Sequence, residues 1–165
     1  MIDTRFSTAL QIVISVAVNE QLGPRCTSET LATSLGTSAS FVRKFLSALS
    51  VAGLVKPSAG YQGGVRLGRP AGEIRLSEIY SLVTVDKRLW ATRDNIPDHC
   101  FITGNIGAFS SDLCQQAERT VMAMLGEMTI ATSIVELRLR DAQRQIPQVG
   151  LSMEASITFM DAGDV

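Results

Sequence analysis

Apolar residues recur at helical spacing near the start of the chain. Between positions 6 and 17 they stand three or four residues apart, which is typical of one buried face of an amphipathic helix. This face consists of Phe6, Ala9, Leu10, Val13, Ile14 and Ala17. Gly23 and Pro24 stop helices, so we expect the helix to end there. Ile12 and Val16 fall off this face, so the helix is expected to be buried on a second side as well.

The next segment predicts two short helices joined by a tight turn. Thr27 or Ser28 can cap the first helix, which ends before Gly36. Thr37 or Ser38 can cap the second helix, which runs to about residue 52. The expected inner face of this second helix is apolar and consists of Phe41, Phe45, Ala48, Leu49 and Ala52.

A glycine-tipped hairpin follows the second short helix. One strand begins at residues 54–55, and residues 65–67 return as its partner. Gly63 and Gly64 tolerate the positive φ that hairpin tips need. Helix, turn, helix and hairpin in this order are the layout of a winged helix-turn-helix, which fits one helix into the DNA major groove with the hairpin beside it.

A long amphipathic helix is predicted in the second half of the chain. A short helix capped by Ser77 precedes it, and a further helix is expected over residues 134–144. The long helix carries an apolar stripe of Phe109, Leu113, Ala117, Val121, Leu125 and Met128. The expected fold is therefore mainly α with a small β-hairpin wing. We divide it into a DNA-binding unit (1–83), a loop that is a candidate sensor region (84–105), dimerisation helices (106–146) and a tail (147–165).

Composition and charge favour a globular protein with one basic end. Apolar residues make up 45% of the 165 positions and charged residues 19%, and the formal net charge is −1. Residues 1–75 hold eight of the 15 basic residues but only four of the 16 acidic ones, which suits a face presented to a polyanion. Chance asymmetry is the alternative. An odd number of cysteines and the lack of a signal or membrane-spanning pattern favour a cytoplasmic protein with no membrane partner.

Small polar and basic side chains are expected to face outward where a recognition helix touches DNA. Arginine can read guanine with two hydrogen bonds, and serine suits phosphate oxygens. The expected DNA contacts are Ser28, Thr37, Ser38, Ser40, Arg43, Lys44, Ser47, Lys56, Tyr61, Gln62 and Arg66. Any exposed helix carries such residues, so each one alone is weak evidence. A winged helix that only binds other proteins is the alternative, and the polar, basic character of this surface favours DNA.

Two motifs carry a resemblance to a known family. The wing G-Y-Q-G-G-V-R-L-G-R at 60–69 and the I-R-L-S-E-I pattern at 74–79 resemble the BadM/IscR-type family of bacterial winged helix-turn-helix transcription regulators, the IscR, NsrR and CymR group. The resemblance covers residues 4–83 by motif and the long helix by layout. It implies a homodimeric regulator, expected to act as a repressor, with one helix-turn-helix on each half of a palindromic operator. Ile12 and Val16 would then contact the partner's long helix, and the stripe would form the dimer seam. The alternative for the stripe is an intramolecular core.

The cysteines depart from the pattern of this family. Several members hold an iron–sulfur cluster on three closely spaced cysteines, whereas Cys26, Cys100 and Cys114 are far apart in this sequence. We therefore expect no iron–sulfur cluster, no other metal and no cofactor. Cys100, beside His99, is a candidate for thiol oxidation, and an unreactive loop cysteine is an equally weighted alternative. Cys114 is expected to pack as a small hydrophobe.

Two further readings concern small molecules. An effector could bind between the DNA-binding unit and the long helix, with Trp90 and Phe101 as candidate lining. An enzyme is not expected, because the sequence has no C-x-x-C, no second histidine and no glycine-rich phosphate loop in a strand–helix unit.

Overall fold

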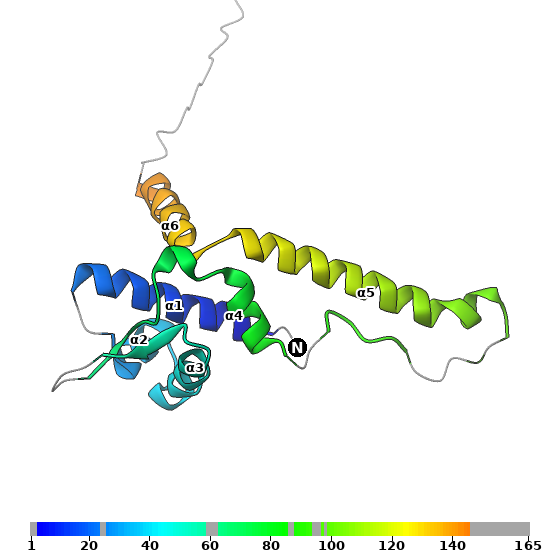
Figure 1. The fold of residues 1–165 in the computed structure, drawn as a ribbon, viewed down its shortest axis with the longest axis horizontal. Helices are drawn as coiled ribbons and strands as arrows, with labels where there is room; N and C mark the ends of the chain where they lie inside the picture. Colours follow the sequence, from blue (N-terminus) through cyan, green and yellow to red (C-terminus); the bar gives the residue numbers. More distant parts are fainter. Residues whose placement is uncertain are drawn as a thin grey trace, which may run out of the picture.

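The computed structural model of the chain describes residues 3–23, 26–58, 63–85, 88–93, 97 and 99–145. Its elements in chain order are α1 (Arg5–Leu22), α2 (Ser28–Leu35), α3 (Ala39–Val51), β1 (Val55–Pro57), β2 (Val65–Leu67), the 3₁₀-helix η1 (Ala71–Glu73), α4 (Leu76–Val83), α5 (Phe101–Glu127) and α6 (Ile130–Gln145). Helices α1 to α4 and the hairpin gather at one end, and α5 extends away from them as a long arm (Figure 1). The fold is a mainly helical winged helix-turn-helix with a two-stranded antiparallel hairpin, as predicted.

Helix α1 is the centre of the DNA-binding unit. It packs against α2, α4, α6 and β2, so neighbours from the same chain cover more than one of its sides. Ile12 and Val16 are both 0% exposed. The prediction that these two residues contact a partner's helix is therefore wrong, because their surface is already used within the chain. The helix ends as predicted, at Gly23 with a φ of 86°.

Local capping contacts define the two helices of the helix-turn-helix. Thr27 Oγ1 accepts a hydrogen bond from the Thr30 amide at 3.2 Å, and Thr30 Oγ1 accepts one from the Thr27 amide at 2.9 Å. This reciprocal pair is a capping box, which satisfies two amides at the start of α2. Ser38 Oγ accepts from the Phe41 amide at 3.2 Å and starts α3. The helix ends and starts around the turn thus agree with the sequence.

The buried face of α3 differs from the expected one. Val42, Leu46 and Leu49 are buried, whereas Phe41 is 41% exposed. Ala48 and Ala52 are exposed, and Phe45 is half-buried. The helix carries two overlapping apolar faces, and packing against α2, α4 and β1 buries the one that contains Val42. Phe41 instead pairs edge-on with Phe45 at the margin, with ring centroids 5.1 Å apart.

The hairpin pairs Val55 with Leu67, Lys56 with Arg66 and Pro57 with Val65. Gly63 and Gly64 have φ values of 54° and 147°, in the region that favours glycine, as expected near the tip. Tyr61 and Gln62 lie outside the described residues. The Gly68 amide donates to Leu54 O at 2.9 Å and holds the base of the hairpin against the segment that follows α3.

Backbone hydrogen bonds join the start of α4 to the junction between α5 and α6. The Leu76 amide donates to Met128 O, and the Ile130 amide donates to Ile74 O, both at 3.0 Å. Arg75 and Thr129 form the β-bridge between these two pairs. The chain therefore fixes the base of α5 to the DNA-binding unit.

Three helix starts differ from the sequence prediction. Arg75, not Ser77, occupies the N-cap position of α4, and the Glu78 carboxylate accepts the Arg75 amide at 2.9 Å. Helix α5 begins at Phe101 rather than at residue 106, so the end of the expected loop is helical. Helix α6 begins at Ile130 rather than at residue 134. Among the described helices, none is long and apolar enough to span a membrane.

The apolar stripe of α5 divides between two surfaces. Phe109 and Leu113 are 63% and 46% exposed, whereas Leu125 is 6% exposed and packs with the core. Ala117 and Val121 are half-buried, and Met128 is exposed. Steps of four residues drift by roughly 40° each around an α-helix, so positions 109 and 125 face nearly opposite directions. Leu125 is therefore a core residue rather than part of an exposed seam.

Candidate nucleic-acid interface

The exposed side of α3 carries a row of small polar and basic side chains. Ser40, Lys44 and Ser47 are exposed and share one side at helical spacing, opposite the buried face. Arg43 is also exposed, and it lies at the edge of this row, next to the start of α2. Lys44 therefore lies at the centre of this row, and Arg43 lies at its margin.

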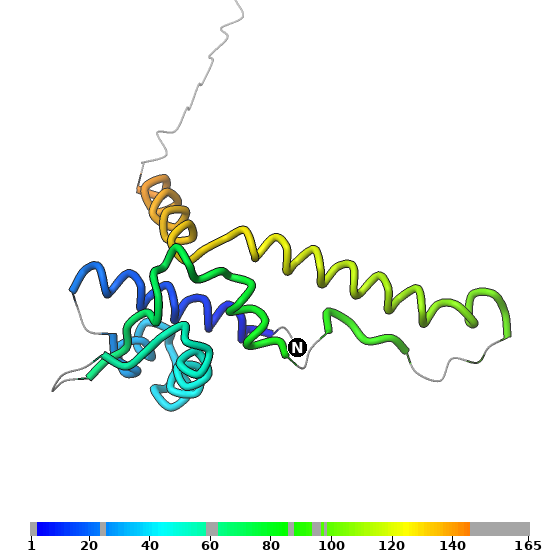
Figure 2. Tube along the Cα trace, viewed as in Figure 1, coloured from blue at the N-terminus to red at the C-terminus, as the bar shows by residue number. Residues whose placement is uncertain are grey.

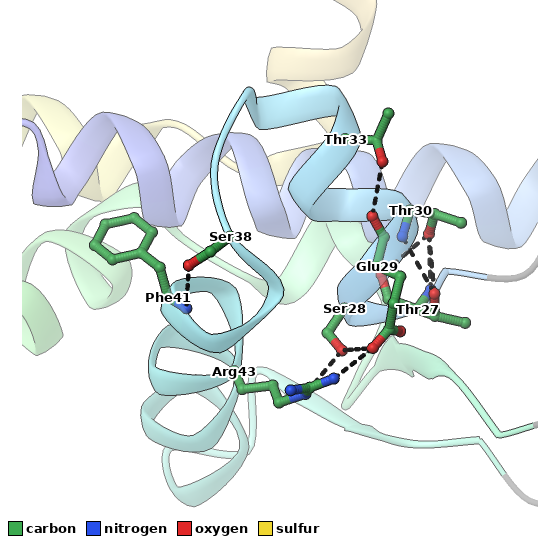
Figure 3. Close-up of polar contacts among 8 residues, drawn as sticks. All are labelled: Thr27, Ser28, Glu29, Thr30, Thr33, Ser38, Phe41 and Arg43. Carbon is green, nitrogen blue, oxygen red and sulfur yellow. Dashed lines mark hydrogen bonds and ion pairs between the residues drawn. The ribbon is translucent and has the colours of Figure 1, made fainter.

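Arg43 is held by two residues of α2, as Figure 3 shows. Its Nε donates to Ser28 Oγ at 3.1 Å, and its Nη2 forms an ion pair with Glu29 Oε1. Ser28 Oγ also donates to Glu29 Oε1 at 3.1 Å. Backbone hydrogen bonding at Glu29 comes first among the causes that keep its pKa below the usual range, followed by the Ser28 and Thr27 hydroxyls and then Arg43. The carboxylate therefore stays ionised near neutral pH.

Glu29 was missed in the sequence. An acidic residue on the candidate DNA-binding surface is opposite in charge to its basic neighbours, and 14 residues separate it from Arg43. The available signal was its position in the first turn of α2, where the helix dipole favours an acid.

Ser38 and Thr37, the other polar residues of the turn, form hydrogen bonds with the backbone of the helices. The Ser38 hydroxyl is engaged in the cap of α3. Thr37 is exposed, and its amide donates to Ala32 O at 3.0 Å. These positions lie beside the amides of a helix N-terminus, the kind of group that attracts phosphate oxygens.

The hairpin presents two basic residues side by side. Lys56 and Arg66 are direct partners across the strands, and both are exposed. The Lys56 ammonium donates to Gly68 O at 3.0 Å. Like charges directly opposite each other destabilise a strand pair, and an anion bound between them relieves that repulsion. A backbone phosphate is an anion of the right kind.

Two shallow grooves flank Arg43 and connect these elements. One groove, of about 270 Å³, runs between the start of α2 and the part of the hairpin just before β2, where Gly63 and Gly64 line it. The other, of about 260 Å³, runs between α3 and the hairpin, where Ser47 and Lys56 line it. Helix α3, the start of α2 and the hairpin therefore form one continuous surface.

Cys100 is exposed at the N-terminus of α5, where it occupies the N-cap position. The backbone amide of Thr103 lowers the pKa of its thiol, with smaller effects from the Thr103 hydroxyl and the Ile102 amide. Sγ lies 3.5 Å from Thr103 Oγ1. His99 was expected to favour the thiolate, but the helix start supplies the stabilising hydrogen bonds instead.

The other two cysteines are buried and lie apart. The Cys114 thiol, 1% exposed, donates to Trp90 O at 3.5 Å, in agreement with its predicted packing role. Cys26 lies between α1 and α2, where burial raises the pKa of its thiol. Within the described parts of the chain, no three His, Cys, Asp or Glu residues lie close enough to hold a metal ion. This donor set does not fit an iron–sulfur cluster within one chain.

A groove of about 600 Å³ lies between α4 and α5. Its lining consists of Tyr80, Ser81, Thr84, Val85, Arg88, Glu118 and Met122. Trp90 and Phe101, the expected lining of an effector site, are not part of it. The Trp90 indole donates to Ser110 O at 3.2 Å, which fixes the segment before α5 along that helix (Figure 2), and Phe101 is 82% exposed.

Two curated proteins are similar to this chain. Protein aau3 of Rhizobium meliloti (strain 1021) is 39% identical over 84 residues, which is 51% of this chain and 49% of that protein. The chain thus spans about half the length of that relative. A candidate HTH-type transcriptional regulator of Bacillus subtilis (strain 168), YwnA, is 30% identical over 100 residues, which is 61% of this chain and 71% of YwnA.

Solved structures share the fold at low sequence identity. A transcriptional-regulator structure from Lactobacillus plantarum has a TM-score of 0.67 at 23% identity, covering 86% of this chain and 97% of that one. IscR of T. potens has a TM-score of 0.61 at 19% identity, covering 90% and 93%. CymR, the global cysteine regulator of B. subtilis, has a TM-score of 0.59 at 20% identity, covering 82% and 97%.

A family model covers most of the chain. The Rrf2 model, described as an iron-dependent transcriptional regulator, matches residues 2–136. The three cysteines lie too far apart to form the iron site that this description implies. The helix-turn-helix and the wing agree with its second part, a transcriptional regulator. The chain belongs to the Rrf2 family of transcriptional regulators, which are not enzymes.

Proposed function

We propose that the protein binds double-stranded DNA as a homodimer and represses transcription from a palindromic operator. One observation carries this proposal: the polar row of α3, the start of α2 and the paired Lys56 and Arg66 form one exposed surface. Helix α3 has the composition of a recognition helix. The hairpin is basic, so it can bind the phosphate backbone of the DNA beside the major groove. Each protomer would occupy one half-site.

The dimer is supported by exposed apolar residues on α5. Ile102, Ile106, Phe109 and Leu113 are all exposed. Their alternating spacing of four, three and four residues is that of a coiled-coil seam. A second copy of the same helix would cover this seam through two-fold symmetry.

Selection of duplexes from a random 30-base-pair library tests the proposal. The full chain should enrich a two-fold motif, and anisotropy titrations should show affinity falling steeply with salt. Lys56→Ala and Arg66→Ala should each lower the salt slope by about one per half-site, because each removes a phosphate contact. Arg140→Ala is the control. It removes an exposed charge on α6, which is far in the sequence from the residues of the candidate DNA-binding surface. A folded dimer that enriches no motif would favour the alternative, a winged helix that binds proteins.

We further propose that the protein works without an iron–sulfur cluster and that its signal is oxidation of Cys100. Exposure and the lowered pKa of this thiol support the second point, because the thiolate attacks hydrogen peroxide, the O–O bond breaks, and sulfenic acid forms with release of hydroxide. Anaerobically purified protein should be colourless. Peroxide should change DNA binding by the wild type and leave Cys100→Ser unchanged. A brown protein contradicts the first point. DNA binding that is the same with and without peroxide contradicts the second point. An effector in the groove between α4 and α5 is then the alternative signal.

A further inference from the structure

We propose that Glu29, on α2, is a positioning residue that holds Arg43 to read one guanine in each half-site. The inference rests on the proposed DNA binding and adds a specificity-determining residue outside the recognition helix. It is carried by the contacts among Glu29, Ser28 and Arg43 that Figure 3 shows.

The contacts occupy one edge of the guanidinium group. A guanidinium has five N–H donors in one plane. Ser28 Oγ takes the Nε donor, and Glu29 Oε1 takes one donor on Nη2. One donor on Nη1 and the second donor on Nη2 lie together on another edge of the plane. Two parallel N–H groups of this kind match O6 and N7 of guanine in the major groove.

The charge of the pair favours a base over a phosphate. The carboxylate cancels much of the attraction that Arg43 would have for a phosphate, and it repels a phosphate that approaches closely. O6 and N7 of guanine are neutral acceptors, so they meet no comparable repulsion. Arg43 paired with Glu29 is therefore better suited to a base edge than to the DNA backbone.

The location and exposure of the pair agree with this role. The side chains of Arg43 and Glu29 are 60% and 63% exposed, so the ion pair contributes little to the stability of the fold. Arg43 lines both grooves on either side of it, where α2, α3 and the hairpin meet. Holding a long side chain in place before DNA arrives also reduces the entropy lost on binding.

The test measures base preference position by position. The duplex selected by the wild-type full chain and its single-base variants are titrated by anisotropy. We expect one guanine per half-site to be preferred by roughly 5- to 150-fold, the range for a bidentate contact, and this preference to disappear in Arg43→Ala. Glu29→Ala and Glu29→Gln should lower the preference at that position by about tenfold and leave the other positions unchanged. The salt slope should steepen by about one per half-site, because the released Arg43 can contact phosphate.

Two controls separate positioning from general effects. Glu136→Gln removes a carboxylate from a similarly exposed ion pair on α6 and should retain the wild-type preference. In an Arg43→Ala background, Glu29→Ala should cause no further loss at the guanine position. The inference is overturned if Glu29→Ala keeps the guanine preference, or weakens binding to all duplexes equally. Failure of the wild type to select any motif would overturn the proposed function as well.

Discussion

Gly68 lies at the base of the hairpin, where no side chain fits. A Cβ at this position would lie 2.0 Å from the carbonyl oxygen of Gly53 and 2.8 Å from its carbon. Gly53 has a φ of 69° just after α3, and the Gly68 amide donates to Leu54 O at 2.9 Å. These close backbone contacts set the position of the wing relative to the recognition helix.

Gly68→Ala is expected to destabilise the protein by about 3 kcal/mol. Adding a methyl group to a closely packed site costs roughly 1–3 kcal/mol, and the upper end applies because the contacting atoms are backbone atoms that cannot rotate away. For a chain of this size, that change lowers Tm by roughly 6–12 °C. DNA affinity should fall as well, since the wing must move to admit the methyl group.

Thermal melts followed by circular dichroism, at equal protein concentration, measure this effect. Gly72→Ala in η1 is the matched control, because a Cβ there meets nothing within 4 Å. Its Tm should stay unchanged or rise slightly through the lower entropy of the unfolded chain. If Gly68→Ala and Gly72→Ala melt at the same temperature, the close contact between the two backbone segments is refuted.

Three other changes test the core, the seam and the thiol. Leu49→Ala removes a side chain that is 0% exposed and should lower the free energy of unfolding by about 2–5 kcal/mol in urea titrations; a loss below about 1 kcal/mol would contradict its place in the core. Leu113→Glu should shift sedimentation toward the monomer, whereas Gln115→Glu, on another side of α5, should not; equal behaviour would remove Leu113 from the seam. Because its pKa is lowered, Cys100 should be alkylated by iodoacetamide faster near neutral pH than a cysteine in an unstructured peptide. Thr103→Val should shift this rate profile to higher pH, and a profile unchanged by that substitution would exclude the hydroxyl as a cause.

Local signals in the sequence were sufficient for the helix-turn-helix and wing. The caps at Thr27 and Ser38 close hydrogen bonds over three residues, and Gly36 reverses the chain with a φ of 62°. Such contacts depend on neighbours in the sequence, so residue type and spacing reveal them.

The buried faces and the Arg43 contacts depend on residues far away in the chain. Ile12 and Val16 are buried because other elements of the same chain pack around α1. On the inner face of α3, Leu49 was predicted correctly, whereas Phe41, Ala48 and Ala52 are exposed. The apolar residues of this helix permit two faces, and only packing selects one. Glu29 reaches Arg43 through the fold, so no spacing within one helix predicts that pair.

A small rotation at the base of α5, where the short β-bridge connects it to the DNA-binding unit, becomes a large displacement along this helix. Helix α5 has 27 residues and is therefore about 40 Å long. Arg75 and Thr129 pair at one end of it, and the Arg75 guanidinium also donates to Gly126 O. If the far end is fixed, a tilt of about 5° displaces the DNA-binding unit by about 3.5 Å, close to the rise of one base pair. In the proposed dimer, the stiffness of this junction, which depends on the β-bridge and on the packing of α4 against α5, would determine how much variation in half-site spacing the protein tolerates.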